Sequence, residues 1–285
     1  MNNCLTNIYQ WAKNNNLAFN SSKFEHIQYG LDNELKSLSV YHSSSGEPIE
    51  KCSSISDLGI SMCNDATFKH HIDNICITAR KMISWICRTF RSRSVTTMLT
   101  TWKALVLPKL EYCSQLWSPH LKKDVQRLEL VQRDFVRKIN IGSKLNYWET
   151  LNHLNMYSLE RRRERYIIMY VWKIIEGLVP NVSASVNRQI TVHQSLRFGR
   201  KCVIPPFLTN SRFSVHYENS LAVIGPKLFN VMPRDIRDLT NCSINAFKCN
   251  LDTFLLTVTD QPVIPGYNGG NNQLHGSNSL IDVVS

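Results

Sequence analysis

A run of arginines followed by aromatic residues is the part of this sequence whose residue types best suit a chemical task. Its members stand close together in the chain: Arg161, Arg162, Arg163, Arg165, Tyr166, Tyr170 and Trp172. Guanidinium groups contact phosphates, and aromatic rings stack on the bases of single strands. The segment therefore predicts nucleic-acid binding. The alternative is that the arginines pair with acids (Glu160, Glu164 and Asp134) and that the rings belong to the core.

A second basic face is expected on a helix over about 122–140. Its polar side holds six cations against three anions, namely Lys122, Lys123, Arg127, Arg133, Arg137 and Lys138 against Asp124, Glu129 and Asp134. Lysines and arginines on a rigid helix can neutralise several phosphates at once. We predict that the nucleic acid contacts Lys122, Lys123, Arg127, Arg133, Arg161, Arg162 and Arg163.

No set of residues typical of catalysis or metal binding is found. The sequence has no glycine-rich dinucleotide motif, no Walker loop, no G-x-S-x-G and no H-E-x-x-H. Two-metal chemistry needs clustered carboxylates, and the nearest candidates, Asp57, Asp65 and Asp73, are better explained as solvated acids or helix caps. His70 and His71 would project about 100° apart on a helix and would not converge on one ion. No metal site is predicted.

The composition is that of a folded, basic protein. The 285 residues are 43% hydrophobic, and the net charge of +11 favours polyanionic partners, nucleic acid before an anionic membrane surface. There is no signal peptide and no run of about 18 apolar residues, so we expect a cytoplasmic or nuclear protein that is not secreted and does not enter a membrane. Nine cysteines without a CxxC pair predict buried, reduced thiols.

Apolar residues at spacings of three and four predict a helical block in the middle of the chain. We expect helices over about 67–90, 95–106, 122–140, 147–154 and 158–177, with a bend or break at Pro108 and a fresh segment over 110–117. Short strands are expected before the block, at 24–29 and 55–60. After it we expect a loop-rich connection over 181–215, a strand at 213–217, a helix over 220–229 interrupted at Gly225 and Pro226, and a last helix over 243–256.

Several short motifs stand in a characteristic order along residues 8–267. They are Leu58-Gly-Ile60, Phe68-Lys-His-His-Ile72, Leu107-Pro-Lys-Leu-Glu-Tyr-Cys-Ser-Gln-Leu-Trp-Ser-Pro119, Leu128-Glu-Leu-Val-Gln-Arg-Asp-Phe-Val-Arg137, Tyr157-Ser-Leu-Glu-Arg-Arg-Arg163, Phe229-Asn-Val-Met-Pro233 and Phe247-Lys-Cys-Asn-Leu-Asp252. In this order they resemble the C-terminal part of reverse transcriptases from non-LTR retrotransposons, such as the jockey and RTE types. The last two resemble a tail that usually reads W-N-x-L-P and F-K-x-x-L, from which Phe229 and Met232 depart.

The resemblance implies roles for three residues near the beginning of the chain. Lys23 matches the lysine of motif D, the general acid toward the pyrophosphate leaving group. Leu58 and Gly59 match motif E, the primer grip. The family's fingers, endonuclease and catalytic aspartates have no counterpart in this sequence. The resemblance therefore implies that this chain holds no cofactor of its own, although the full-length enzyme uses Mg²⁺.

The expected fold is mainly α, a thumb-like helical bundle with a small antiparallel β piece, and α+β overall. We divide it into the end of the palm with its primer-grip hairpin (1–62), a helical thumb-like domain (63–180), a C-terminal region of mixed structure (181–260) and a disordered tail (261–285).

We expect a fragment of a retrotransposon RNA-directed DNA polymerase that binds RNA or an RNA–DNA hybrid but lacks the catalytic aspartates. The missing palm, fingers and endonuclease of the parent polyprotein would be its natural partners. The alternative is a domesticated or residual helical module that binds protein and not nucleic acid. Whether the upstream portion is missing only from this sequence, or was lost from a decayed genomic copy, stays open.

Overall fold

The structure is a computed structural model that describes residues 2–29, 40–139, 145–179, 191–204, 214–264 and 278–284. The chain divides into two compact units, Met1–Ile75 and Cys76–Ser285. Helices make up 56% of the structure, and the only sheets within the described ranges are two antiparallel pairs of strands. This confirms the predicted fold class, mainly α with a small β piece. The finer division into four parts stays a prediction.

The described residues of the first unit contain a helix and a β-hairpin. Its elements are the helix α1 (Asn2–Asn14), the 3-10 helix η1 (Ser21–Lys23) and the strands β1 (Ser54–Asp57) and β2 (Ile60–Cys63). Tyr9, Phe19 and Phe24 pack edge to face, with ring centroids 5.7–5.9 Å apart. The strand predicted at 24–29 is wrong, because only His26 forms a bridge there, to Lys51.

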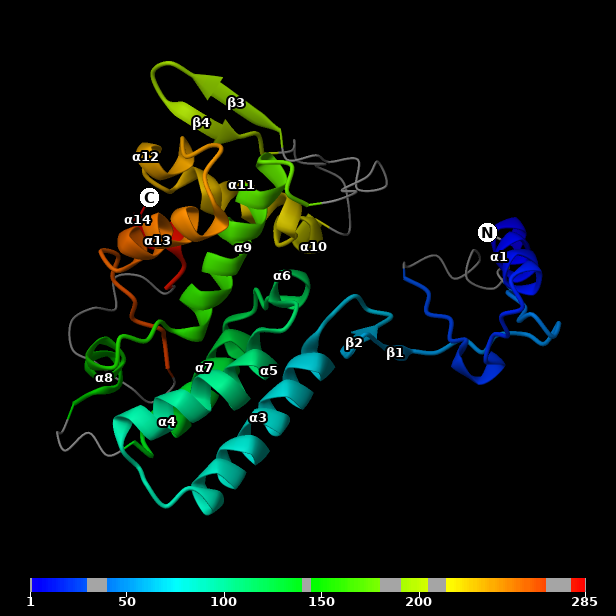
Figure 1. Ribbon diagram of the computed structural model, residues 1–285, viewed down its shortest axis with the longest axis horizontal. Helices are drawn as coiled ribbons and strands as arrows, with labels where there is room; N and C mark the ends of the chain where they lie inside the picture. The colour runs from blue at the N-terminus through cyan, green and yellow to red at the C-terminus, as the bar shows by residue number, and fades with distance from the viewer. Residues whose placement is uncertain are drawn as a thin grey trace. The chain divides into compact units, whose positions relative to one another are not determined.

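The second unit is built on the helix α9 (Leu159–Ile175), which contacts α6, α7 and α11. Before it come α3 (Lys69–Thr89, which starts in the first unit), α4 (Val95–Thr101), the π-helix η2 (Trp102–Val106), α5 (Leu107–Glu111), α6 (Ser114–Trp117), α7 (Lys122–Val136) and α8 (Tyr147–His153). After it come β3 (Val192–Ser195), β4 (Gly199–Cys202), α10 (Ser214–Glu218), α11 (Leu221–Asn230), α12 (Arg234–Arg237), α13 (Ile244–Leu255) and α14 (Leu280–Val284). Figure 1 shows α9 running between these two groups.

Serine caps start three of these helices. The hydroxyl oxygens of Ser94, Ser158 and Ser243 accept the N–H of the residue three positions later, which satisfies a backbone donor that the first turn leaves free. At the other end of α9, Gly177 has a φ of +68°, the left-handed conformation typical of a residue that ends a helix. These residues lie at or next to the ends of the helices predicted over about 95–106, 158–177 and 243–256.

The helix continues through Pro108, where a bend or break was predicted. The turn before the proline widens into the π-helix η2, in which the Leu107 N–H donates to the carbonyl of Trp102, five residues back. In a regular α-helix Pro108 would lack the N–H that bonds to the carbonyl four residues earlier, and its ring would clash with that carbonyl. The π turn replaces this four-residue hydrogen-bond pattern just before the proline. The chain breaks instead at Cys113, whose φ is +50°.

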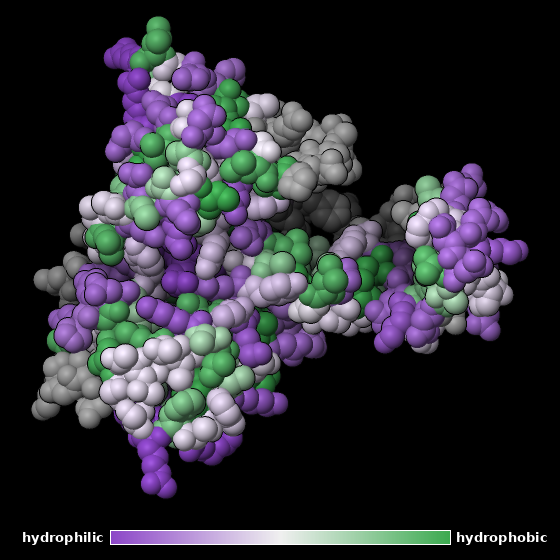
Figure 2. Space-filling view, in the orientation of Figure 1, coloured by the Kyte–Doolittle hydropathy of each residue, from purple (hydrophilic) through white to green (hydrophobic). Residues whose placement is uncertain are grey.

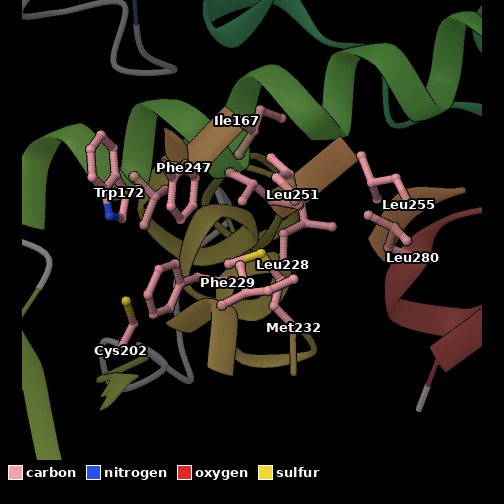
Figure 3. Packing of buried hydrophobic residues seen from close by; sticks show 13 residues of the cluster. Ile167, Trp172, Cys202, Leu228, Phe229, Met232, Phe247, Leu251, Leu255 and Leu280 are labelled. Carbon is pink, nitrogen blue, oxygen red and sulfur yellow. The ribbon is translucent and has the colours of Figure 1, made fainter. Parts of the chain in front are cut away.

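The core of the C-terminal half is centred on α9 and α13 (Figure 3). Trp172 stacks on Phe247, with ring centroids 4.4 Å apart and planes 9° from parallel. Such a pair contributes about 0.5–1.5 kcal/mol beyond the burial of its surface. Phe229 and Met232 are buried in the same cluster.

Gly225 lets α11 approach α9 closely. A Cβ at this position would lie 2.7 Å from Cγ2 of Val171, a branched side chain that cannot move away. We expect Gly225→Ala to lower the free energy of unfolding by about 1–3 kcal/mol, the usual cost of overpacking. Thermal or urea unfolding measures it. In a Val171→Ala background the same substitution should cost nothing, and a full cost there would contradict the packing argument.

Three other expectations can be compared with the structure. Residues 214–218 form the helix α10, so the strand predicted at 213–217 is wrong for the part that is described. Residues 278–284 contain α14, with Leu280 fully buried, which differs from the disorder expected there. All nine cysteines are free, although only Cys76 and Cys202 are buried. Among the described helices, none is long and apolar enough to span a membrane.

Candidate nucleic-acid interface

Arg161 lies inside the protein, in the first turn of α9. Its side chain is fully buried, and its guanidinium donates to the carbonyls of Thr259 and Asn278 at 3.0 and 3.1 Å. Its Nε lies 3.9 Å from the carboxylate of Glu164, which also accepts the N–H of Leu280. Arg161 and Glu164 therefore attach the chain near 259 and the segment 278–284 to α9.

Arg162 and Arg165 join α9 to two other helices. The Arg162 guanidinium donates to both carboxylate oxygens of Glu111 on α5, and the Tyr166 hydroxyl donates to the same carboxylate at 3.1 Å. Arg165 forms a similar two-pronged pair with Asp252 on α13. Pairs of this geometry are the strong class of charge-assisted hydrogen bonds.

Arg163 and Glu129 form the buried centre of this network. Arg163 is 3% exposed and Glu129 is fully buried on α7. The Glu129 carboxyl accepts the N–H of Glu160 at 2.8 Å and the hydroxyl of Tyr147 at 3.4 Å. Burial raises the pKa of Glu129 to about 8, against the opposing effect of the Arg163 cation. Burial likewise raises the pKa of Glu164 to about 7, opposed mainly by Arg161.

These positions correct the expectation that the arginine run faces a ligand. Arg161 and Arg163 are buried, and Arg162 is paired with Glu111, so none of the three presents an open guanidinium. Trp172, expected as a stacking ring, lies in the core against Phe247. We therefore leave these residues out of the interface proposed below.

The predicted cations of α7 differ in exposure from the buried or paired arginines of α9. Lys122 and Lys123 are exposed in the first turn of the helix. Their charges add to the positive end of the helix dipole, which favours anions nearby. Arg127 and Arg133 are half-buried farther along, and the carbonyl of Arg127 receives the Cys76 thiol from α3. Of the four cations predicted here to contact nucleic acid, Lys122 and Lys123 are therefore exposed, and Arg127 and Arg133 are only partly so.

The outer face of α3 and the turn after it form an exposed basic surface, which we call the α3 face. It consists of Lys81, Trp85, Arg88 and Arg91, all exposed. From Asn74 to Leu110 the chain has no acidic residue and seven cations: Arg80, Lys81, Arg88, Arg91, Arg93, Lys103 and Lys109. Arg80 is paired with Asp134 on α7, at 3.8 Å. Within the described residues, Lys81, Arg88 and Arg91 form no ion pair.

None of the four residues of the α3 face was predicted as a binding residue from the sequence, and Trp85 is its aromatic member. Its side chain is 45% exposed and meets the ring of Phe90 edge-on, with centroids 6.2 Å apart. The signal was its spacing: Trp85 falls four residues after Lys81 and three before Arg88, which places all three on one side of a helix.

The three residues assigned by resemblance lie in the first unit. Lys23 is exposed at the end of η1. Leu58 and Gly59 form the two-residue turn between β1 and β2, with φ values of +46° and +83°. Two positive φ angles are typical of a type I′ hairpin, which favours asparagine at the first position. Leu58 is instead a strained and 82% exposed leucine at the tip.

Three of the side chains weighed as metal ligands make hydrogen bonds to other groups. Asp65 accepts the N–H and hydroxyl of Thr67, both at 2.9 Å, as a local cap. His70 contacts Asn74, whereas the His71 ring accepts the N–H of Ser61. Among the residues that the structure describes, no three histidine, cysteine, aspartate or glutamate side chains gather as a metal site requires.

Two known proteins are similar to this chain in sequence. One is a Drosophila melanogaster protein named "Probable RNA-directed DNA polymerase from transposon X-element", 23% identical over 175 residues. The other is "Uncharacterized protein B0403.1" of Caenorhabditis elegans, 25% identical over 189 residues. No protein-family profile and no solved structure matches the chain.

The two matches differ in how much of each relative they include. The match to the transposon polymerase covers 55% of this chain but only 19% of that much longer protein. The match to the nematode protein covers 61% of this chain and 95% of that protein. The chain therefore contains a region similar to part of a transposon RNA-directed DNA polymerase.

Proposed function

We propose that this chain is part of a retrotransposon RNA-directed DNA polymerase and that it binds RNA or an RNA–DNA hybrid. The similarity to the transposon polymerase supports the first half of the proposal. The observation that carries the second half is the α3 face, where exposed cations surround an exposed tryptophan in a stretch without acids.

Phosphates are the chemical group that this surface suits best. Lys81, Arg88 and Arg91 have no described acid to neutralise them, so their charge is available to a polyanion and its binding would release counterions. Trp85 offers a flat apolar ring among these cations. Lys122 and Lys123 on α7 extend the same positive character within the second unit. In the polymerase these helices would belong to the thumb, which holds the template and primer.

The residues implied by the resemblance belong to this proposal as well. Lys23 would act as general acid, and Leu58 and Gly59 as primer grip, only if the palm of the parent enzyme were supplied. The Mg²⁺ ions of that enzyme need a carboxylate cluster, and the described residues offer none. We therefore propose nucleic-acid binding, and no polymerising step, for this chain alone.

A triple variant of the α3 face tests the proposal. We expect Lys81→Gln/Arg88→Gln/Arg91→Gln to weaken binding to labelled RNA and to an RNA–DNA hybrid by about tenfold or more at moderate salt. The magnitude of the slope of log affinity against log salt should fall by about two to three, because a phosphate that is no longer contacted keeps its counterions. Fluorescence anisotropy at several salt concentrations gives both quantities.

The matched control removes three exposed lysines elsewhere, as Lys13→Gln/Lys51→Gln/Lys248→Gln. Its net charge equals that of the α3 variant, so it should bind nearly as well as the unmodified chain. Equal losses in the two variants would mean that only net charge matters, and the α3 face would then have no special role. Lys122→Gln/Lys123→Gln tests in the same way whether α7 contributes.

One observation, the exposure of Ile77, favours the alternative function, a helical module that binds protein. It is 50% exposed one turn before Lys81, so the same helix also presents apolar surface to which a protein could bind. If neither RNA nor the hybrid binds and the chain forms a defined oligomer by light scattering, the protein-interaction module becomes the better explanation.

A further inference from the structure

We infer that the tip of the β3–β4 hairpin, Leu196–Lys201, is a separate binding site for single-stranded nucleic acid. This inference rests on the proposed nucleic-acid function but concerns residues far along the chain from the α3 face. The connection over 181–215 was expected to be loop-rich, and the hairpin within it was not predicted. Val192 pairs with Cys202 and Ser195 with Gly199, which leaves a three-residue turn at the tip.

The tip combines an open aromatic ring with two cations. Leu196 is 99% exposed and Phe198 is 54% exposed. The guanidinium carbon of Arg197 lies 5.3 Å from the centre of the Phe198 ring, and Nζ of Lys201 lies 5.4 Å from it. Figure 2 shows hydrophobic and hydrophilic side chains next to each other at the outer end of this hairpin.

Buried arginines hold the hairpin firmly at and next to its turn. The Arg237 guanidinium donates to the carbonyls of Arg200, Phe198 and Met232. Arg200 donates in turn to the Glu176 carboxylate at 2.7 Å and to the carbonyl of Leu239. The carbonyls of Phe198 and Arg200 are therefore fixed to α12 through Arg237, and the Arg200 side chain attaches the strand to Glu176 at the end of α9.

Gly199 makes this close docking possible. Its φ is +66°, and a Cβ there would lie 2.6 Å from both carboxylate oxygens of Asp238. Asp238 receives the N–H of Arg200 at 2.7 Å and the guanidinium of Arg234 at 3.0 Å, so its charge is already engaged. Asp238 thus holds the strand beside the turn, and its hydrogen bonds are to Arg200 and Arg234, which leaves the Arg197 and Lys201 cations to a ligand.

Single-stranded nucleic acid is the ligand that uses all of these groups. Its phosphates can bind the Arg197 and Lys201 cations, and its unpaired bases can pack on Phe198 and Leu196. A duplex offers phosphates but keeps the faces of its bases inside the stack, so it would use the cations alone. An acidic peptide would likewise satisfy the charges but offer no flat surface to the ring.

The test separates base contacts from phosphate contacts. We expect Phe198→Ala to weaken binding of a labelled single-stranded RNA by about tenfold, yet to leave binding of an abasic strand of the same length unchanged. Phe198→Trp, which keeps an aromatic ring at this position, should bind the RNA about as tightly as the unmodified chain. Arg197→Gln/Lys201→Gln should weaken binding of both strands. Because Phe198 and Lys201 lie on the surface, we expect each variant to stay folded, which circular dichroism checks.

Each outcome bears on one proposal separately. If Phe198→Ala binds both strands like the unmodified chain while the α3 variant loses affinity, the hairpin site is overturned and the proposed function stands. Equal loss on the base-containing and abasic strands would also overturn it, because the ring would then not contact bases. If the unmodified chain binds no nucleic acid at all, both proposals fail, and binding of a poly-glutamate peptide would assign the tip to an acidic protein.

Discussion

Replacing Arg161 by alanine is expected to lower the free energy of unfolding by about 3–5 kcal/mol, the range found when one partner of a buried ion pair is removed. Arg161 is fully buried. Its loss removes the cation that lies 3.9 Å from the Glu164 carboxylate and leaves the carbonyls of Thr259 and Asn278 without their donor. Urea unfolding followed by circular dichroism measures the change.

Two further variants make this result specific. Arg88→Ala removes an arginine from the exposed α3 face and should change stability by no more than about 0.5 kcal/mol. The double variant Arg161→Met/Glu164→Leu removes both buried charges together, so it should lose less than the sum of the two single substitutions. A loss below about 1 kcal/mol for Arg161→Ala would contradict a structural role for this side chain.

The stability of these variants also affects how binding data are interpreted. Charge reversal across Arg161–Arg163 would weaken RNA binding even if no arginine touched RNA, because it would place carboxylates beside Glu111, Glu129 and Glu164 in the interior. Variants of the α3 face are free of this ambiguity, since Lys81, Arg88 and Arg91 lie on the surface.

Much of the helical structure could be predicted because its signals are local. The apolar spacing of α3, α7, α9 and α13 and the caps at Ser94, Ser158 and Ser243 involve residues within a few turns of one another. Pro226 shows where such signals fail. It lies inside α11, which forms because Gly225 allows the helix to pack on Val171, a residue more than fifty positions away.

The candidate site was harder to predict because charge in a sequence does not reveal exposure. Arg162 is paired with Glu111 and Arg165 with Asp252, 51 and 87 residues away. Such partners are invisible to patterns of spacing, so a buried network and a binding surface look alike. Two signals were nevertheless available. One is the absence of acids from Asn74 to Leu110, and the other is the sequence Arg-Phe-Gly at 197–199, where glycine permits the left-handed backbone that follows the hairpin turn.

The buried network also predicts that the stability of the protein falls as the pH rises above about 4.5. Glu129 is fully buried, and its pKa rises from 4.5 to about 8 on folding, mainly because burial penalises the charged form. Below pH 4.5 the carboxyl is protonated in both states. Between pH 4.5 and 8 the folded protein keeps a proton that the unfolded chain releases, so each pH unit costs up to about 1.4 kcal/mol.

The variant Glu129→Gln isolates this effect, because the amide cannot titrate and its oxygen can still accept the N–H of Glu160. Titration of Glu160 and Glu164 occurs in both proteins and cancels in the comparison. We expect the unmodified chain to lose stability relative to the variant from about pH 4.5 to 8 and to level off above that range. Urea unfolding of both proteins across this range measures the difference. A constant difference would mean that Glu129 has the same pKa in both states. A relative gain with rising pH would mean that the Arg163 cation outweighs burial and that Glu129 is ionised in the folded protein.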